Sequence, residues 1–253
     1  MKGEPAPNRL AASAANSLID ALSPDTRREL QPRLQRVHLP AGTVLCRGGE
    51  TMRHAYFPIT GLISLVGSTS DGQLLQVAAV DRRGFVGVPI VLGTLATTLD
   101  IVVHVPGEAE RIGAADLRAH CQRSLQVRQV AFGWIDKHVA AIAQGVLCHR
   151  FHTVRQRLCR WLLALARSLD GRTVPLTQEC LAHILGSPRS TVSGAAITLQ
   201  DHGLIRLRHG RIHILDRSAL EAWACECYAA DPVAFPSSRN LRGDALCVGS
   251  SWV

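Results

Sequence analysis

The amino-acid sequence predicts an α+β protein in which an antiparallel β domain precedes a long helix and a C-terminal winged helix-turn-helix. Three observations support this prediction. Turn residues separate short β-rich segments from Val37 to Ile112. An apolar repeat without proline extends from Ser124 to His152. Two short predicted helices flank Gly186. A chain of 253 residues is long enough for one large domain or two moderate domains, each with its own core.

The composition is that of a globular protein, with 47% hydrophobic residues and a net charge of +8. Most of the positive charge lies between residues 153 and 217, where ten arginines and four acidic residues give a local net charge of +6. A localised basic surface favours a polyanionic partner, because neutralised phosphates release counterions. A basic face that serves only solubility is the alternative at this point.

The sequence gives no sign of a membrane or secretion signal. It contains no run of about eighteen apolar residues, so no membrane-spanning helix and no membrane partner are expected. The segment from Met1 to Asn16 lacks the basic start and apolar run of a signal peptide. The simplest expectation is a cytoplasmic protein.

The cysteine spacing argues against a metal or redox site. There is no C-x-x-C pair, and Cys225-x-Cys227 is the only close pair among the eight cysteines. Zinc and iron–sulfur sites usually need two such clusters, so we expect structural cysteines, no metal ligands and no cofactor. No single histidine stands out as a haem ligand, because each has a surface or core explanation, and no subset has metal-type spacing: His54, His104, His120, His138 and His149.

The N-terminal half begins with helix and continues with strands. Residues 1–15 are expected to be flexible, and residues 16–36 to form a short amphipathic helix interrupted at Ser23-Pro24. Turn signals about ten residues apart then predict an antiparallel sandwich or barrel. Asp71-Gly72 is expected to form a two-residue hairpin turn, since both residues tolerate positive φ.

Helix is expected from Ala114 onwards, with one long helix between Ser124 and His152. Apolar residues recur along it at steps of three and four, which is the pattern of a helix packed against a partner. The stripe could pack only on the β domain, but we favour a dimer seam with a second copy of the chain. The predicted seam residues are Phe132, Ile135, Val139, Ile142 and Val146.

A second amphipathic helix is expected to start at the capping residue Thr153 and to end at Gly171. The stretch from Ala229 to Val253 is rich in Pro, Ser and Gly and shows no periodicity. We expect a mobile tail there.

Residues 177–202 predict a helix-turn-helix. Thr177 is a capping residue, and Gly186 ends the first helix in a tight turn. Ser187 is expected to cap the second helix, with Pro188 at its first position. Two short helices joined by a glycine-containing turn are typical of major-groove binding.

The second of these helices is expected to read DNA. Its inward stripe is apolar, which leaves Arg189 free for a bidentate contact with guanine. The strands flanking His209-Gly210 predict a wing with arginines for the phosphate backbone. A generic helical hairpin is the alternative, but the wing and the local charge favour DNA. The candidate DNA-binding residues are Thr177, Gln178, Ser187, Arg189, Ser190, Thr191, Ser193, Gly194, Arg208 and Arg211.

From about residue 18 to 228 the chain resembles the bacterial CRP/FNR superfamily of transcription regulators. The resemblance is carried by Leu39-Pro40-Ala41-Gly42-Thr43-Val44-Leu45 with Gly49-Glu50, Tyr56-Phe57-Pro58, Gly61, Arg83-Gly84-Phe85-Val86-Gly87, the long helix, Leu176-Thr177-Gln178 and Gly203-Leu204-Ile205. It implies a jelly-roll-like β-roll sensor domain, a dimerisation helix and a winged helix-turn-helix. The expected divisions are a flexible N-terminus (1–15), the sensor domain (16–122), the dimerisation helix (123–152), the DNA-binding domain (153–228) and the mobile tail (229–253).

The resemblance also implies partners: a two-fold symmetric duplex operator, a second copy of the chain, RNA polymerase and a small-molecule effector. Gly194 departs from members that have an arginine there, so a different operator is expected. Glycine costs about 1 kcal/mol in a helix relative to alanine, and here it either permits close approach to DNA or is a tolerated defect.

The effector pocket departs further. Val88 stands where cyclic-nucleotide binders of the family have a glutamate, and Thr97-Thr98 where they have an Arg-Ser pair. Without a cation a cyclic phosphate would be poorly stabilised, so cyclic AMP is not the expected effector. The residues of this degenerate pocket are Phe85, Val86, Gly87, Val88, Thr97 and Thr98.

Two other classes of protein compete with a DNA-binding regulator. An enzyme is not expected, because there is no nucleophile elbow or phosphate loop, and the adjacent helical residues Cys148 and His149 point apart. A sensor or scaffold that has lost DNA binding is the second class. Duplex affinity that falls steeply with salt would distinguish a regulator from it.

Overall fold

The structure is a computed structural model that describes residues 15–169, 171 and 173–230. The predicted flexible N-terminus, apart from residue 15, lies outside the described residues. So does the predicted mobile tail from residue 231 onwards, which includes Cys247.

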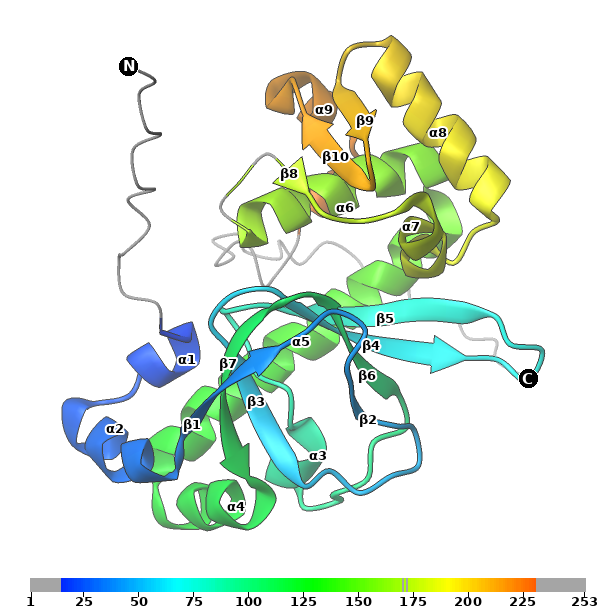
Figure 1. The fold of residues 1–253 in the computed structure, drawn as a ribbon. Coiled ribbons are helices and arrows are strands. Elements are labelled where there is room, and N and C mark those ends of the chain that lie inside the picture. The colour runs from blue at the N-terminus through cyan, green and yellow to red at the C-terminus, as the bar shows by residue number, and fades with distance from the viewer. Residues whose placement is uncertain (1–14, 170, 172, 231–253) are drawn as a thin grey trace, which may run out of the picture.

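The described residues form helices at both ends of the chain, with strands and further helices between them (Figure 1). The helices are α1 (Ser17–Asp20), α2 (Pro24–Leu30), η1 (Gln31–Arg33), α3 (Val88–Leu92), α4 (Ala114–Arg123), α5 (Leu125–Phe151), α6 (Val154–Ser168), α7 (Gln178–Leu185), α8 (Arg189–Asp201), α9 (Arg217–Trp223) and η2 (Glu226–Tyr228). The strands are β1 (Gln35–Leu39), β2 (Val44–Cys46), β3 (His54–Pro58), β4 (Leu62–Ser68), β5 (Leu74–Val80), β6 (Asp100–Val105), β7 (Gly107–Gly113), β8 (Thr173–Val174), β9 (Ile205–Arg208) and β10 (Arg211–Ile214).

The first seven strands form two antiparallel sheets, ordered β2-β6-β4-β5 and β1-β7-β3, which confirms the predicted antiparallel β-roll. Alternate residues of β6 are buried, as expected for a strand with one face on a core. The central pairing of the larger sheet places Ile63 opposite Val103, and both side chains are buried. The core formed between the sheets also receives α1 to α5.

The predicted N-terminal helix is confirmed in α1 and α2, and the break falls at Ser23-Pro24. The Ser23 hydroxyl caps α2 by accepting from the Thr26 N–H, and Pro24 occupies its first position. Strand β1 begins at Gln35, so the helical region is shorter than residues 16–36.

The hairpin between β4 and β5 differs from the prediction. A five-residue loop, 69–73, joins the strands, and of the Asp71-Gly72 pair only Gly72 has a positive φ, of 84°. The Asp71 carboxylate accepts from the Thr69 hydroxyl and from the Gln73 side-chain amide, which stabilises the longer loop. A two-residue turn prediction misses these side-chain contacts.

Helix does begin at Ala114, and Ser124 separates α4 from α5 by adopting an extended conformation and capping α5 through its hydroxyl. Helix α5 packs on the β-roll through a face that includes Val127, Trp134 and His138. Gly84 permits this contact, because a Cβ atom there would lie 2.3 Å from Trp134 Nε1.

A second core lies between α6, α7, α8, α9 and the small antiparallel sheet β8-β10-β9. Thr153 caps α6 as predicted, and Gln156 completes a capping box. The Gly171 N–H donates to the Ala166 carbonyl at 3.0 Å just beyond the helix, also as predicted. Figure 1 shows this helical unit stacked on the β-roll, with α5 running behind the strands of the β-roll toward the helical unit. Within the described residues, every helix is too short or too polar to cross a lipid bilayer.

Candidate DNA-binding interface

Helices α7 and α8 form the predicted helix-turn-helix. The Thr177 hydroxyl caps α7 by accepting from the Cys180 N–H at 3.2 Å. Gly186 follows α7 with φ 52°, a left-handed conformation that suits glycine. The Cα atom of Gly186 is also close to the β-roll, since a Cβ atom added to it would lie 2.7 Å from Leu75 Cδ1.

The start of α8 differs from the prediction, because Ser187 does not cap it and Pro188 is the N-cap residue. The Ser187 hydroxyl instead accepts from Arg157 Nη2 at 2.9 Å and contacts the Leu185 carbonyl at 3.1 Å. Arg157 Nη1 donates to that same carbonyl, also at 3.1 Å. A buried guanidinium on α6 therefore holds the turn, and sequence reasoning missed it because Arg157 lies 28 residues before Leu185.

The first turn of α8 faces solvent. Arg189, Ser190 and Thr191 are exposed, whereas Val192 and Leu199 on the opposite face are fully buried. Pro188 offers no side-chain cap, so the first N–H groups of α8 are available to a partner. Such groups, together with the positive end of the helix dipole, favour phosphate.

The remaining candidates on these helices lie in two environments. The Ser193 hydroxyl is half-buried and donates to Gln178 Oε1 at 2.8 Å, so this pair ties α8 to α7. Gly194 is exposed, and a Cβ atom there would meet nothing within 4 Å among the described residues. Packing within this part of the chain therefore does not require glycine at 194.

The predicted wing is confirmed as the β9–β10 hairpin, with His209 at φ 46° and Gly210 at φ 70° in a tight turn. Arg208 pairs directly with Arg211, and Arg206 with His213. These side chains share one face of the hairpin, because residues two apart on a strand point the same way. The other face holds Leu207 and the buried residues Ile205, Ile212 and Ile214.

Arg206 was not among the predicted contact residues, although the alternation of residues 205–208 is a signal for it. Like charges directly opposite each other destabilise a hairpin, so the arginine face favours binding of an anion. Within the described part of the chain, four exposed arginines of α8 and the wing form no ion pair: Arg189, Arg206, Arg208 and Arg211.

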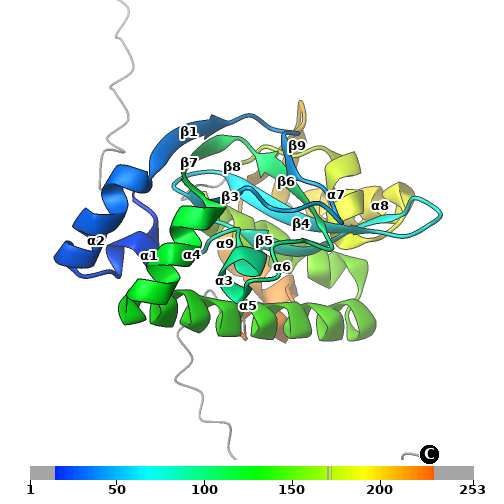
Figure 2. The same cartoon turned by 90° about the horizontal axis from the view of Figure 1, so that it is seen from below.

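Three of the five predicted seam residues lie on a different face of α5 from the one that packs on the β-roll. Phe132, Val139 and Val146 recur every seven residues and are 46%, 59% and 66% exposed. The other two, Ile135 and Ile142, are half-buried, and Ile135 packs against the β-roll core. Figure 2 shows α5 along one edge of the molecule, with the β-roll on one side only.

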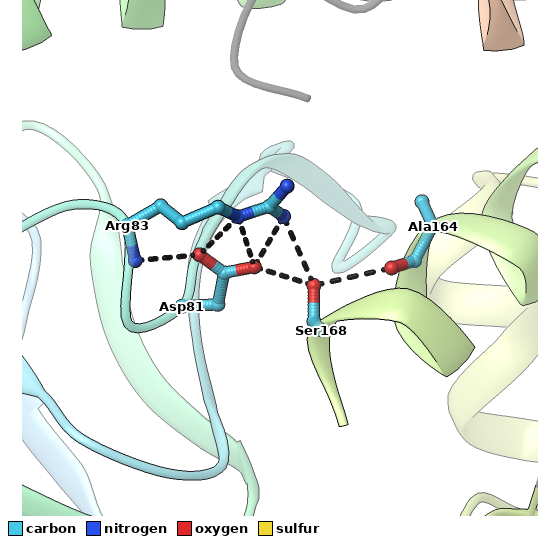
Figure 3. Close-up of polar contacts among 4 residues, drawn as sticks. All are labelled: Asp81, Arg83, Ala164 and Ser168. Carbon is cyan, nitrogen blue, oxygen red and sulfur yellow. Dashed lines mark hydrogen bonds and ion pairs between the residues drawn. The ribbon is translucent and has the colours of Figure 1, made fainter. Parts of the chain in front are cut away.

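A buried polar contact joins the β-roll to the helical unit (Figure 3). The Asp81 carboxylate, just after β5, accepts from Arg83 Nε at 3.1 Å and from the Ser168 hydroxyl at the end of α6. Arg83 Nη2 also donates to Ser168 Oγ at 3.2 Å. Burial raises the pKa of Asp81, but the hydrogen bonds and charge of Arg83 outweigh it and leave that pKa below its ordinary value.

A cavity of about 160 Å³ lies beside this contact, between β5, α5, α6 and α7. It is lined by residues of both units, among them Asp81, Trp134, His138 and Ser168. His138 stacks on Trp134 at a centroid distance of 4.4 Å. Burial lowers the pKa of His138 to about 4, so its ring is neutral near pH 7.

The predicted effector residues lie elsewhere. Phe85 and Val86 belong to the core, where the Phe85 ring stacks on Phe57 and contacts Trp134 in a tilted arrangement. Thr97 is buried with its hydroxyl hydrogen-bonded to Leu99, and Thr98 is exposed. Gly87 and Val88 form the start of α3.

The structure brings together one group of cysteines and a histidine that spacing along the sequence does not reveal. Cys148, His152, Cys225 and Cys227 offer ligand atoms that all lie within 4.8 Å of one another. The spacing of Cys148 and His152, four residues apart at the end of α5, is a signal for a shared helix face. Their approach to Cys225 and Cys227 is long-range and has no sequence signal. His149, by contrast, contacts the Gly145 carbonyl and not Cys148.

Comparison with known proteins matches both units to domain families. Residues 36–124 match the cyclic nucleotide-binding domain. Residues 156–223 match the Crp-like helix-turn-helix domain. The first match covers the two large sheets, and the second covers α7, α8 and the wing.

Individual proteins agree with these matches. Transcriptional regulator LdrP of Thermus thermophilus is 26% identical over 186 residues, which cover 68% of this chain and 88% of that protein. Two solved structures share the fold. A CRP-family transcriptional regulator, also from Thermus thermophilus, has a TM-score of 0.64 at 21% identity and covers 75% of this chain and 96% of its own. The c-di-GMP-responsive global regulator CLP of Xanthomonas campestris has a TM-score of 0.64 at 18% identity and covers 77% of this chain and 100% of its own.

The two domain types occur here in the order and connection that the resemblance implies, with a β-roll, a long helix and a winged helix-turn-helix. The family consists of transcription regulators, which are not a class of enzymes. This chain belongs to the CRP/FNR family and is a DNA-binding transcription regulator.

Proposed function

We propose that the protein binds a two-fold symmetric operator as a homodimer, with the N-terminal turn of α8 in the major groove and the wing on the phosphate backbone. The observation that carries this proposal is Arg189, which is exposed at the uncapped start of α8 and has no ion pair among the described residues. Its guanidinium suits bidentate contact with guanine O6 and N7. Ser190 and Thr191 beside it suit phosphate or base edges.

The wing and the turn supply the remaining contacts of the proposed interface. Arg206, Arg208 and Arg211 share the exposed face of the wing and suit phosphates, which position the protein without reading sequence. Thr177 lies beside the wing turn, since a Cβ at Gly210 would be 3.8 Å from its methyl group. We also propose that open space around Gly194 allows close approach of DNA, on an operator unlike that of members with arginine there.

The proposed dimer uses the exposed heptad stripe of α5. Phe132, Val139 and Val146 would pack against the same residues of a second copy, which gives an interface with two-fold symmetry. Such a dimer would present two α8 helices to half-sites about one helical turn, roughly 34 Å, apart.

The proposed effector is a small molecule other than cyclic AMP. The side chain of Val88 offers no group for a ribose, and Thr97 and Thr98 offer no cation for a phosphate. Its site would lie in the sensor domain, proposed at residues 16–122, and its effect would reach residues 153–228 through α5. RNA polymerase is the further partner proposed for a regulator of this family.

Operator binding by Arg189→Ala tests the proposal. Operators selected from random duplexes should be two-fold symmetric, and binding should fall steeply as salt rises. The Arg189→Ala variant should lose about 1–3 kcal/mol of operator-binding free energy, and its preference at one base position of each half-site should be relaxed. Arg28→Ala, an exposed substitution on α2, serves as the control and should bind like the parent protein.

Two results would contradict the proposal. One is selection of asymmetric operators by a monomer. The other is an Arg189→Ala variant whose base preference equals that of the parent, since that would place another residue in the major groove.

A further inference from the structure

Four metal-type ligands meet where α5 ends, outside the DNA-binding interface and the β-roll. Cys148 and His152 come from the last turn of α5 and the residue after it, and Cys225 and Cys227 from the segment that follows α9. Cys148 Sγ lies 3.6 Å from Cys225 Sγ, and Cys227 Sγ lies 3.5 Å from His152 Nδ1. All four ligand atoms lie within 4.8 Å of one another.

The two shortest of these distances agree with the edges of a zinc tetrahedron, and the longer ones, up to 4.8 Å, would shorten by about 1 Å on binding an ion. With Zn–S bonds of about 2.3 Å and Zn–N bonds of about 2.0–2.1 Å, tetrahedral geometry gives S···S edges of about 3.8 Å and S···N edges of about 3.6 Å. We propose that Cys148, His152, Cys225 and Cys227 form a closed structural zinc site. Three sulfur ligands and one imidazole are a common donor set of structural zinc.

The surroundings of the four side chains orient them for this task. His152 Nε2 contacts the Glu226 carboxylate at 3.0 Å, which leaves Nδ1 free to face the thiols as a ligand. A carboxylate on the outer nitrogen of a histidine is the usual support of a zinc ligand. Gln144 Nε2 donates to Cys227 Sγ at 2.9 Å, and such a bond stabilises a thiolate.

Burial and charge also favour a metal at this place. Cys148, Cys225 and Cys227 are 0%, 3% and 1% exposed and form a cluster separate from both main cores. Zinc binding would release three thiol protons and leave a centre with one net negative charge. The Arg160 guanidinium, which interacts electrostatically with Cys148 and Cys225, would offset that charge.

A zinc ion here would join α5 to the end of the helical unit. His152 immediately precedes Thr153, the residue that caps α6, so the site lies at the connection between the long helix and the helix-turn-helix. A simple disulfide would use two of the thiols and leave the third thiol and the His152–Glu226 pair unexplained. The zinc assignment accounts for all four side chains.

Metal content of the untagged full-length protein tests the site. After purification without chelators or metal-affinity steps, elemental analysis should find one zinc per chain. Cobalt added to the chelator-treated protein should give the intense absorption of a tetrahedral sulfur-ligated ion. Cys225→Ser and Cys227→Ser should lower zinc content at least about tenfold, as expected for lost ligands. Cys180→Ser, a half-buried cysteine outside the cluster, should retain it.

Stability measurements give a second readout that does not depend on DNA binding. Removing zinc from the parent protein should lower Tm by at least about 5 °C, and zinc should restore it. Parent protein that contains no zinc and binds no cobalt after reduction would overturn the proposal. A Cys148–Cys225 disulfide in metal-free protein kept under reducing conditions would also overturn it, as would an iron–sulfur absorption spectrum.

Discussion

Arg157 lies on the buried face of α6, and its guanidinium holds two groups of the helix-turn-helix turn. Its planar fork reaches the Leu185 carbonyl and the Ser187 hydroxyl together, whereas a lysine ammonium reaches only one. The carbonyl belongs to the last residue of α7, where a cation is favourable to the helix dipole. Arg157 therefore sets the angle between α7 and α8 without facing DNA.

Arg157→Lys should lower the free energy of unfolding by about 1–2 kcal/mol and weaken operator binding about fivefold to tenfold, because one buried contact is lost. Chemical denaturation and a binding titration measure the two effects. Arg155→Lys on the exposed side of the same helix is the control, since a lysine keeps a cation over the Trp223 ring. Equal stability and affinity in both variants would show that the turn does not need the guanidinium.

His138 should make stability depend on mildly acidic pH. Its folded-state pKa of about 4 lies below the ordinary value of about 6.5, so the unfolded chain takes up the proton first. The stability that neutral His138 contributes is complete above pH 6.5 and is lost as pH falls towards 4, with a total on the order of 3 kcal/mol.

The variant His138→Phe keeps an aromatic ring against Trp134 and removes the titrating group. Its free energy of unfolding, measured by denaturant titration between pH 7 and pH 4, should fall less than that of the parent protein. Identical pH profiles for the two proteins would mean that other groups account for the acid sensitivity.

At the scale of elements, α5 combines two faces with different surroundings. One face packs Trp134 and His138 on the β-roll, and the other exposes Phe132, Val139 and Val146. The single seven-residue repeat in the sequence is thus divided between the chain's own core and its exposed side. That separation leaves an apolar stripe exposed, which is where we propose that a second copy packs.

Val139→Glu should convert the proposed dimer into monomers, because two carboxylates would meet at the two-fold axis. Sedimentation velocity should show the change, and Tm measured at low protein concentration should change little, since Val139 is 59% exposed. Ala140→Glu, exposed on α5 outside the stripe, should leave the assembly intact. A Val139→Glu protein that stays dimeric would place the interface elsewhere.

At the scale of the whole molecule, the helical unit contacts the β-roll at several places, two of which involve β5 and the residue that follows it. Leu75 of β5 meets the turn at Gly186, and Asp81 meets Ser168 at the end of α6. The cavity between these elements is lined from both sides. A movement of β5 would therefore shift the helix-turn-helix.

Asp81→Asn should weaken this contact, because the buried Arg83 pairing loses its charge. We expect a loss of about 2–3 kcal/mol in unfolding free energy and faster amide exchange at the end of α6. The matched control is Glu108→Gln, which breaks the exposed Arg36–Glu108 pair and should cost less than about 1 kcal/mol. Exchange rates at α6 equal to the parent's would show that Asp81 does not join the two units.

The sequence by itself determined the order of elements and the position of the helix-turn-helix. Local rules suffice for these features, because Thr153 and Thr177 cap helices through residues three positions away and His209-Gly210 turns within one hairpin. The prediction that Ser187 caps α8 was wrong for a long-range reason, because the Ser187 hydroxyl accepts a hydrogen bond from Arg157 on α6 instead.

Only the tertiary structure decided which distant residues meet. Asp81 reaches Ser168 across 87 positions, and Cys148 reaches Cys225 across 77. Spacing rules for metal sites count neighbours along the chain, so they missed a cluster assembled from a helix end and the segment after α9. The physical reason is that capping and periodicity act within one or two turns, whereas ligand clusters and domain contacts depend on how whole elements pack.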